Sequence, residues 1–247
     1  MNKITNIELT VIVTFYKRDD YAKIIMQSLD KEVKSCGINV EVIFADSKSS
    51  TTLQKTLDQI SYISNIRYKI IHTNNDITSK RNFGILNANS DKLILIDDDC
   101  IPEKNFISDH NYTLEKNKNK KNINSGIVNF DENLTKNSNF IRYKNQRHRN
   151  YDSIYNSNIS MNIHNIVCMN LSCYRSELLK NDLWFDKDYK TYGLEDTQFA
   201  LDAIKKGFTL KSSNGAITHQ DATSIDTFFY KIQLFSINYF HKFYLKN

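Results

Sequence analysis

Three consecutive aspartates, Asp97 to Asp99, follow directly on four apolar residues in the stretch LILIDDDCIPEKN. Adjacent carboxylates repel one another, and removing them from water is costly. Two arrangements tolerate such a run: a solvated turn, or a site that supplies a cation. Mg²⁺ and Mn²⁺ prefer hard oxygen ligands of this kind. The elements that position the run help to decide between these alternatives.

The aspartates stand at the end of one of four short apolar segments that alternate with helical patterns. Apolar residues at helical spacing after residue 19 end at Gly37, a residue that commonly follows a helix. Alternation of strand and helix predicts an α/β protein with a parallel sheet covered on both faces. The strands are predicted at 9–15, 40–45, 68–72 and 92–96.

Other polar residues follow the predicted strands at the same edge of the sheet. Asp46 ends the second strand, and residues 14–18 end the first. Ligands of open α/β sheets bind outside the carboxyl ends of the strands. The convergence of three polar groups at this edge therefore favours a binding site over a solvated turn.

The second half of the chain is less regular. Strands are predicted at 123–130 and 167–174, one or two short strands within 209–219, and helices at 104–118 and 196–206. The segment 138–163 is polar, basic and aromatic without a clear period, which predicts a long loop. In the tail, aromatic residues recur every three or four positions, which predicts a helix packed on the domain. A helix that binds a membrane surface or a partner is the alternative.

Composition and charge narrow the class of protein. The 247 residues are 40% hydrophobic, enough for a sizeable core. The net charge of +5 includes eight cations in two clusters, at 116–121 and 142–149, without which it is −3. No nucleic-acid recognition module accompanies these clusters, so they predict either solvated loops or a surface for anionic lipid or acceptor. No signal peptide or apolar run of about 20 residues is evident, and we expect a cytoplasmic protein with reduced thiols.

Five features in order resemble the GT-A glycosyltransferases, most closely the inverting family 2 type. They are the VIVTFYKR strand, the aspartate ending the second strand, the KRNFGI helix, the strand ending in DDD, and GLED opening a later helix. The resemblance spans residues 8–220 and rests on order and spacing. It implies one GT-A domain over 1–247, with a central, mostly parallel sheet flanked by helices. Within this domain, a nucleotide-binding half would span about residues 1–103 and an acceptor-binding half about residues 104–222. A helical tail would follow at 223–247.

The resemblance assigns the donor side of a site. Asp99 and His219 would bind Mn²⁺ or Mg²⁺, which stabilises charge on a departing diphosphate. Asp97 and Asp98 would contact the ribose or metal-bound water. The remaining nucleotide-sugar residues would be Thr14, Tyr16, Arg18, Asp46 and Arg81.

The resemblance also assigns the acceptor side. Transfer with inversion needs a base on the acceptor hydroxyl, and Asp196 would take that role with Glu195 orienting the acceptor or sharing it. Asp196 opens a predicted helix, where the helix dipole favours a carboxylate; simple helix-end charge is the alternative. Acceptor-binding positions would be Asn170, Trp184 and Gly193.

Competing families fit less well. A sugar-nucleotide pyrophosphorylase needs a glycine-rich loop near its N-terminus, and the segment TVIVTFYKRDD has no glycine. A haloacid-dehalogenase phosphatase needs a different aspartate motif, which the segment IDDDCIP does not match. A retaining GT-A enzyme and an inactive nucleotide-binding subunit remain alternatives, although intact Asp99, Asp196 and His219 argue against the latter. We therefore predict a metal-dependent, inverting transferase that moves a sugar from a UDP-sugar to a glycan or lipid-linked acceptor in surface polysaccharide or glycoconjugate synthesis. The basic clusters or the tail could hold it at the inner face of the membrane.

Overall fold

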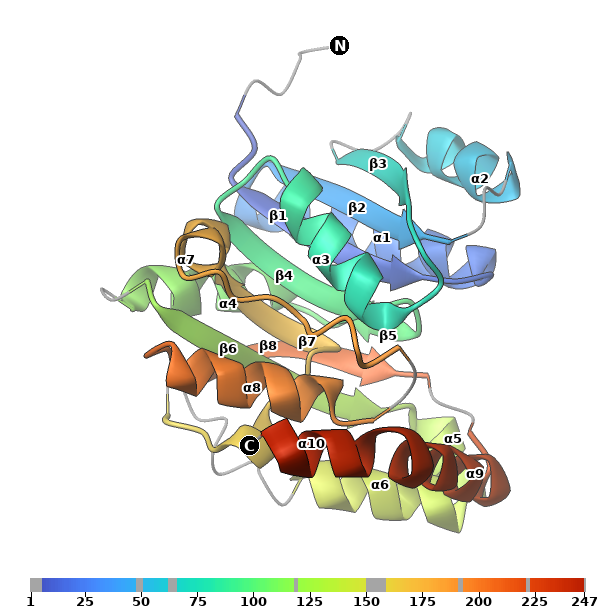
Figure 1. Cartoon of the computed structure of the whole chain (residues 1–247). Helices are drawn as coiled ribbons and strands as arrows, with labels where there is room; N and C mark the ends of the chain where they lie inside the picture. Colours follow the sequence, from blue (N-terminus) through green and yellow to red (C-terminus); the bar gives the residue numbers. More distant parts are fainter. Residues whose placement is uncertain are drawn as a thin grey trace.

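The computed structural model describes residues 6–47, 51–61, 66–117, 120–149, 159–190, 193–220 and 223–246. In these ranges eight strands form one sheet in the order β3-β2-β1-β4-β7-β6-β8-β5, with helices on both faces (Figure 1). The strands are β1 Leu9–Phe15, β2 Val40–Asp46, β3 Arg67–His72, β4 Lys92–Asp97, β5 Cys100–Pro102, β6 Asn122–Phe130, β7 Asn170–Tyr174 and β8 Thr209–His219. The helices are α1 Asp19–Cys36, α2 Thr51–Ser61, α3 Ile77–Asn87, α4 Phe106–Lys116, α5 Glu132–Asn137, α6 Asn139–Arg149, η1 Ile163–Asn165, α7 Arg175–Lys180, α8 Glu195–Lys205, α9 Ile225–Phe235, η2 Ser236–Phe240 and α10 His241–Lys246.

The first half of the sheet is parallel, as the alternating pattern predicts. β1 pairs with both β2 and β4, and β2 pairs with β3, all in parallel. All residues of β1 and β2 are buried, so these strands are mostly apolar without alternation. The register places Thr14 beside Asp97 and Phe15 beside Asp46, which brings the polar strand ends to one edge.

The second half of the sheet is mixed. β7 runs antiparallel to both β4 and β6, whereas β6 and β8 are parallel. Because β7 lies between β4 and β6, both halves of the chain share one continuous sheet. The predicted class, an α/β fold with a central sheet flanked by helices, is confirmed. The single strand β8 covers the whole of 209–219.

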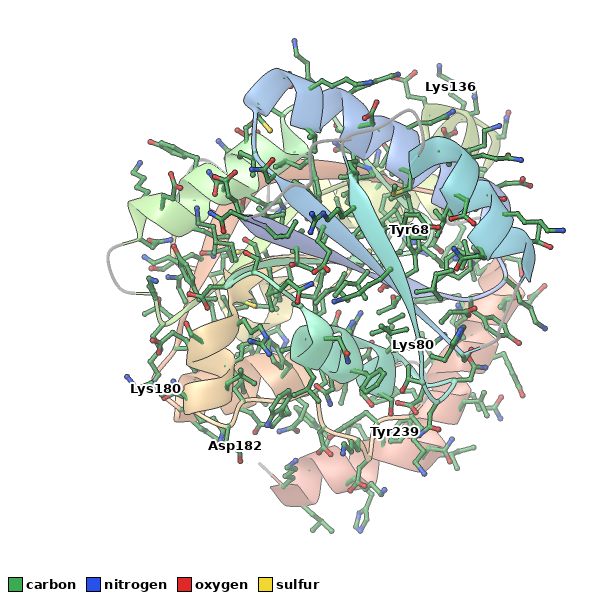
Figure 2. The ribbon with its side chains drawn as sticks, turned by 90° about the horizontal axis from the view of Figure 1, so that it is seen from above. Tyr68, Lys80, Lys136, Lys180, Asp182 and Tyr239 are labelled. Carbon is green, nitrogen blue, oxygen red and sulfur yellow. The ribbon has the colours of Figure 1, made fainter. Side chains whose placement is uncertain are left out.

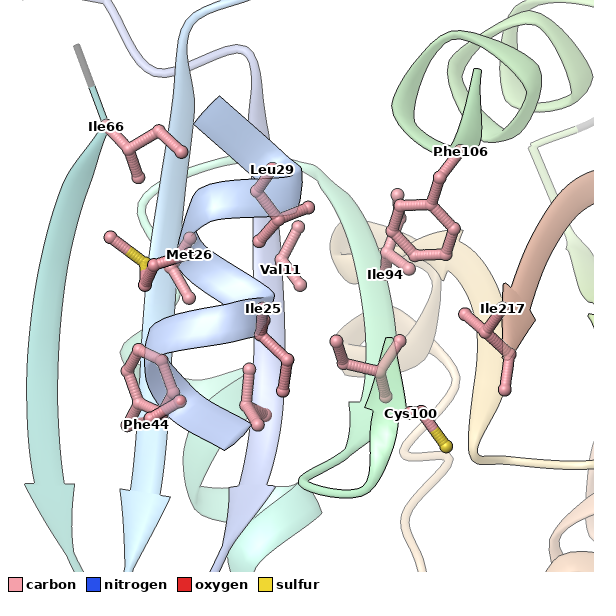
Figure 3. Packing of buried hydrophobic residues seen from close by; sticks show 14 of the residues in the cluster. Val11, Ile25, Met26, Leu29, Phe44, Ile66, Ile94, Cys100, Phe106 and Ile217 are labelled. Atoms are coloured by element: carbon pink, nitrogen blue, oxygen red, sulfur yellow. The ribbon is translucent and has the colours of Figure 1, made fainter. Parts of the chain in front are cut away.

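Two apolar clusters lie on opposite faces of the sheet. Figure 3 shows one of them, in which Ile25, Met26 and Leu29 of α1 face Val11 and Phe44 of β1 and β2. On the other face, the sheet packs against α3, α7 and α8 through Ile85, Leu178 and Phe199. Each fully buried side chain of this size contributes about 1.5–3 kcal/mol. The sheet is therefore packed on both faces, and this packing fixes the positions of the residues at its edge.

The prediction of a loop over 138–163 is wrong for part of its length. Residues Asn139–Arg149 form the helix α6. Its Ile141 is buried, and the ring of Phe140 lies 5.1 Å from that of Phe228 in α9. Packing on β6 and this distant contact with α9, rather than a local apolar period, order the helix. Residues 150–158 of the predicted loop lie outside the described residues.

The tail forms one continuous helix over residues 225–246, hereafter the C-terminal helix. It comprises α9, the π-helical turns of η2, and α10. In Figure 1 it lies in front of the lower part of the sheet, beside α6 and α8. Among the described residues, none of the helices has the length and apolarity needed to cross a bilayer.

Candidate active site

A cavity of about 280 Å³ opens at the carboxyl ends of β1 and β4. The sheet register explains its position, since it places the polar ends of these strands side by side. Seven predicted site residues contribute to its wall: Thr14, Tyr16, Arg18, Asp97, Asp98, Asp99 and Glu195. The structure thus brings together residues from both halves of the chain.

Hydrogen bonds from β1 and the residues after it hold the aspartate run. The Thr14 hydroxyl donates to Oδ1 of Asp97 over 2.6 Å, and the backbone N–H of Tyr16 donates to Oδ2 of Asp98 over 2.7 Å. Nη1 of Arg18 lies 2.6 Å from Oδ1 of Asp98 and 2.7 Å from Oδ2 of Asp99. Burial raises the pKa of Asp98 to about 6, although the charge of Arg18 opposes this shift. One guanidinium therefore offsets the repulsion between neighbouring carboxylates.

Asp99 and His219 form the candidate metal site. Oδ1 of Asp99 lies 3.4 Å from Nε2 of His219, and Nδ1 of His219 is buried without a hydrogen-bond partner among the described residues. Burial would raise the pKa of Asp99, but interactions with His219 and Arg18 hold that pKa below its usual range. A carboxylate oxygen and an imidazole nitrogen suit Mn²⁺ or Mg²⁺, so these residues fit a divalent ion.

The thiol of Cys100 is close to the same two residues, within 4.8 Å. Its side chain is fully buried, and burial raises the pKa of Cys100 well above its usual value. Thiolates bind softer metals, whereas Mn²⁺ and Mg²⁺ prefer oxygen ligands. Cys100 therefore adds little to a donor set built from Asp99 and His219.

The buried guanidinium of Arg81 links the two acidic clusters. Arg81 projects from α3, and its Nη1 lies 2.8 Å from Oδ1 of Asp196 and 3.7 Å from Oε1 of Glu195. Its Nη2 lies 3.4 Å from Oδ1 of Asp97. Arg81 was predicted to contact the nucleotide; the structure places it behind the cavity wall, where it spans both clusters. Its neighbour Lys80 lines the cavity instead.

A strained turn positions the Glu195–Asp196 pair. Gly193 and Leu194 have φ of 120° and 61°, and the N–H of Gly193 donates to Oε2 of Glu195 over 3.0 Å. Asp196 accepts a 3.0 Å hydrogen bond from the backbone N–H of Cys168. Burial and the neighbouring charge of Asp196 raise the pKa of Glu195 to about 7. Glu195 thus faces the cavity with a pKa near neutrality, the range that suits a general base.

Three further predicted residues, Asp46, Asn170 and Trp184, do not line this cavity. Asp46 is buried at the end of β2. Asn170 is fully buried: its Nδ2 donates to two backbone carbonyls, and its Oδ1 lies 2.8 Å from Nε2 of His110. Trp184 borders a second cavity of about 540 Å³, and its indole N–H donates to Asp182 over 2.7 Å. The structure therefore gives Asn170 internal partners instead of an open position.

The cavity wall also contains residues that the sequence analysis did not select. Lys80, labelled in Figure 2, donates from Nζ to the carbonyl of Phe15 over 2.8 Å and to Asn75 over 3.2 Å. Lys190 lines the opposite side, next to the turn that leads to Glu195. The basic residues of KRNFGI were a signal for Lys80, but no pattern marked Lys190. With Arg18, these lysines surround the carboxylates with positive charge, an arrangement that can accept a diphosphate.

Comparisons with known proteins agree with this fold. The model of the family described as glycosyl transferase family 2 matches residues 10–179. No curated protein matches the chain. Among solved structures, S. aureus TarS is similar at a TM-score of 0.61 and 16% identity, over 93% of this chain and 39% of TarS. TarS residues 1–349, solved with UDP and with UDP-GlcNAc, match at a TM-score of 0.61 and 16% and 14% identity, over 94% of this chain and 65% and 66% of that fragment. This chain therefore spans about two fifths of TarS.

Proposed function

This chain belongs to glycosyl transferase family 2; we propose that it is a glycosyltransferase that transfers a sugar from a UDP-sugar to a hydroxyl of a glycan or lipid-linked acceptor, with inversion. One observation carries the proposal: Arg81 lies between the aspartate run and the Glu195–Asp196 pair, so both acidic clusters meet at one cavity. The TarS structures with UDP and UDP-GlcNAc support a UDP-sugar as donor.

On the donor side, Asp99 and His219 would hold Mn²⁺ or Mg²⁺. The ion, when bound, would neutralise charge on the departing diphosphate. Arg18, Lys80 and Lys190 line the cavity and would attract the same diphosphate. In this proposal the nucleoside lies over the ends of β1 and β2, with contacts from Thr14, Tyr16, Asp46, Asp97 and Asp98.

On the acceptor side, Asp196 would take the proton of the attacking hydroxyl. Arg81 and the backbone N–H of Cys168 hold its two oxygens, so its position relative to the donor is set. Glu195 would contact the acceptor from the cavity wall and could share the proton. Gly193 permits the turn before the pair. Trp184, beside the second cavity, and Asn170, through its internal hydrogen bonds, would shape the acceptor side at greater distance.

The proposal places this reaction in surface polysaccharide or glycoconjugate synthesis in the cytoplasm. All four cysteines are unpaired, which fits a reducing compartment. Attachment to the inner face of the membrane would bring the enzyme to lipid-linked acceptors. The C-terminal helix, discussed below, is the element suited to that contact.

Thermal unfolding with UDP, GDP, CDP and TDP, each with Mn²⁺ or with EDTA, tests the donor and metal without requiring an acceptor. A ligand at 100 times its Kd stabilises the native state by about 2.7 kcal/mol. We expect a clear increase in Tm with UDP and Mn²⁺ only, followed by release of UDP from a UDP-sugar. A shift with another nucleotide would contradict the UDP assignment. The absence of any shift would favour an inactive subunit.

A further inference from the structure

The C-terminal helix exposes an unusual number of large apolar side chains. Their exposed fractions range from 37% for Ile232 to 77% for Tyr244. Soluble proteins rarely expose apolar surface in one continuous patch, and such patches commonly mark interaction sites. The apolar patch comprises Ile225, Phe229, Tyr230, Ile232, Ile237, Phe240, Tyr244 and Leu245.

The opposite side of the C-terminal helix contacts the segment that leads to the catalytic pair. The hydroxyl of Tyr239 accepts a 3.1 Å hydrogen bond from the N–H of Lys190, and its ring lies 5.3 Å from that of Tyr189. Phe235 packs so closely on Gly193 that a Cβ there would lie 2.7 Å from its ring. Figure 2 shows Tyr239 on this helix. The helix is therefore a support for the turn before Glu195.

The lysines of the C-terminal helix pair with that same segment. Lys246 forms an ion pair with Asp186, and Nζ of Lys242 lies 4.0 Å from Asp188. A surface helix usually turns its apolar stripe to the core and its charges to water. Here two of the lysines contact the domain while the apolar patch faces outward, so the patch is suited to a second, apolar environment.

The C-terminal helix has a neighbouring helix, α6, that is rich in basic residues. α6 packs beside α9, with Nζ of Lys144 lying 6.0 Å from the ring centre of Phe228. Together, α6 and the C-terminal helix contain seven lysines and arginines against one aspartate, a formal charge of +6. The whole chain carries +5, so all other residues together carry −1. α6 and the C-terminal helix therefore contain the excess positive charge of the chain.

From this arrangement we propose that the C-terminal helix and α6 bind an anionic lipid surface, and that this contact steadies the turn before Glu195 and stimulates sugar transfer. The stimulation rests on the proposed function; the binding does not. An interfacial helix buries apolar side chains at the level of the headgroups, while basic residues attract anionic lipids. The residues of the patch all belong to one helix, which lies on the outside of the fold (Figure 1), and such a helix suits a membrane surface better than a protein groove.

Vesicle sedimentation tests the binding independently of activity. The full chain is mixed with phosphatidylcholine vesicles, with or without about 30% phosphatidylglycerol. We expect binding to the anionic vesicles, and at least about tenfold weaker binding to neutral vesicles or in high salt. Equal binding to both kinds of vesicle, or no binding to either, would overturn the proposal.

Paired variants test whether the apolar patch carries the binding. Phe240→Ser, combined with Phe229→Ser, should weaken vesicle binding at least about tenfold, since each ring contributes apolar burial. Tyr112→Ser in α4 is the matched control, because Tyr112 is 58% exposed, as is Phe240. An equal loss of vesicle binding in the double variant and in Tyr112→Ser would contradict the assignment of binding to the apolar patch. A dimer in the unmutated chain that the double variant dissociates, without vesicle binding by either, would identify the occupant as a second copy.

UDP release from a UDP-sugar, with and without anionic vesicles, tests the coupling. We expect vesicles to raise the turnover several-fold in the unmutated chain and in Tyr112→Ser, but not in the double variant. Without vesicles, the Tyr112→Ser variant and the double variant should keep the basal turnover of the unmutated chain and its Tm shift with UDP and Mn²⁺. Vesicle binding without stimulation would disprove the coupling alone. Binding together with no UDP response would leave lipid binding intact and disprove the proposed function.

Discussion

The two acidic clusters of the cavity are held in different ways. Asp97 ends the buried strand β4 beside the parallel strand β1, and Asp98 and Asp99 form the turn that leads directly to β5. Glu195 and Asp196 open a helix after two residues with positive φ, beside a segment supported by the C-terminal helix. The donor side therefore depends on the sheet, whereas the acceptor side depends on contacts between distant elements. Arg81 is the residue that contacts both clusters.

The largest expected effect comes from breaking the donor cluster. Asp99→Ala should lower turnover by about 10³-fold, because it removes the carboxylate of the candidate metal site. The Tm without ligand should change little, and the additional shift with UDP and Mn²⁺ should vanish. Turnover and thermal unfolding measure both results. Unchanged turnover would remove the metal assignment.

Breaking the acceptor cluster should separate chemistry from donor binding. Asp196→Asn keeps the shape of the side chain but removes the base, which typically contributes 10²–10⁴-fold. We expect about a 10²–10³-fold loss in kcat with the Tm shift from UDP and Mn²⁺ retained. Single-turnover assays and thermal unfolding make the comparison with Asp99→Ala. Loss of the UDP response in this variant would argue that the two clusters do not have separate roles.

Removing the link between the clusters should lower stability and activity together. Arg81→Met leaves Asp196 and Asp97 without their shared buried cation, and breaking a buried ion pair costs about 3–5 kcal/mol. Both carboxylates are partly exposed, so we expect about 3 kcal/mol or somewhat less in urea unfolding. Arg142→Met, on the exposed surface of α6, is the control and should stay within about 0.5 kcal/mol. Equal free energies of unfolding for Arg81→Met and Arg142→Met would mean that the ion pairs of Arg81 contribute nothing to stability.

The smallest effect concerns the pH dependence of the acceptor side. Because burial and Asp196 raise the pKa of Glu195 to about 7, its carboxyl is largely protonated at pH 6 and ionised at pH 8. If the ionised form assists transfer, activity rises as pH increases through about 7. Glu195→Gln should then lower turnover about tenfold at pH 8 and very little at pH 6. A pH–rate profile that keeps the same rise in the variant would assign it to another group.

Regular elements were predictable because their signals are local. Strands predicted at 9–15 and 68–72 differ from β1 and β3 by at most one residue, and Gly37 follows α1 with a φ of 69°. The aspartate run was recognisable as a site because like charges at the end of a buried strand need compensation. In contrast, α6 was missed because its order depends on tertiary packing, on β6 and on a helix about 90 residues later in the chain.

The sequence by itself determined the α/β class, the positions of the first four strands along the chain, and the common sheet edge of Asp97 to Asp99 and Thr14, since short-range apolar patterns suffice for these. Only the tertiary structure decided that β7 runs antiparallel between β4 and β6, that Arg18 offsets the aspartate run, and that Arg81 lies against Asp196. Arg81 and Asp196 are 115 positions apart, and no local pattern encodes such a contact. Their pairing depends on the packing of α3 and α8 on the same face of the sheet, where burial makes the contact of opposite charges necessary.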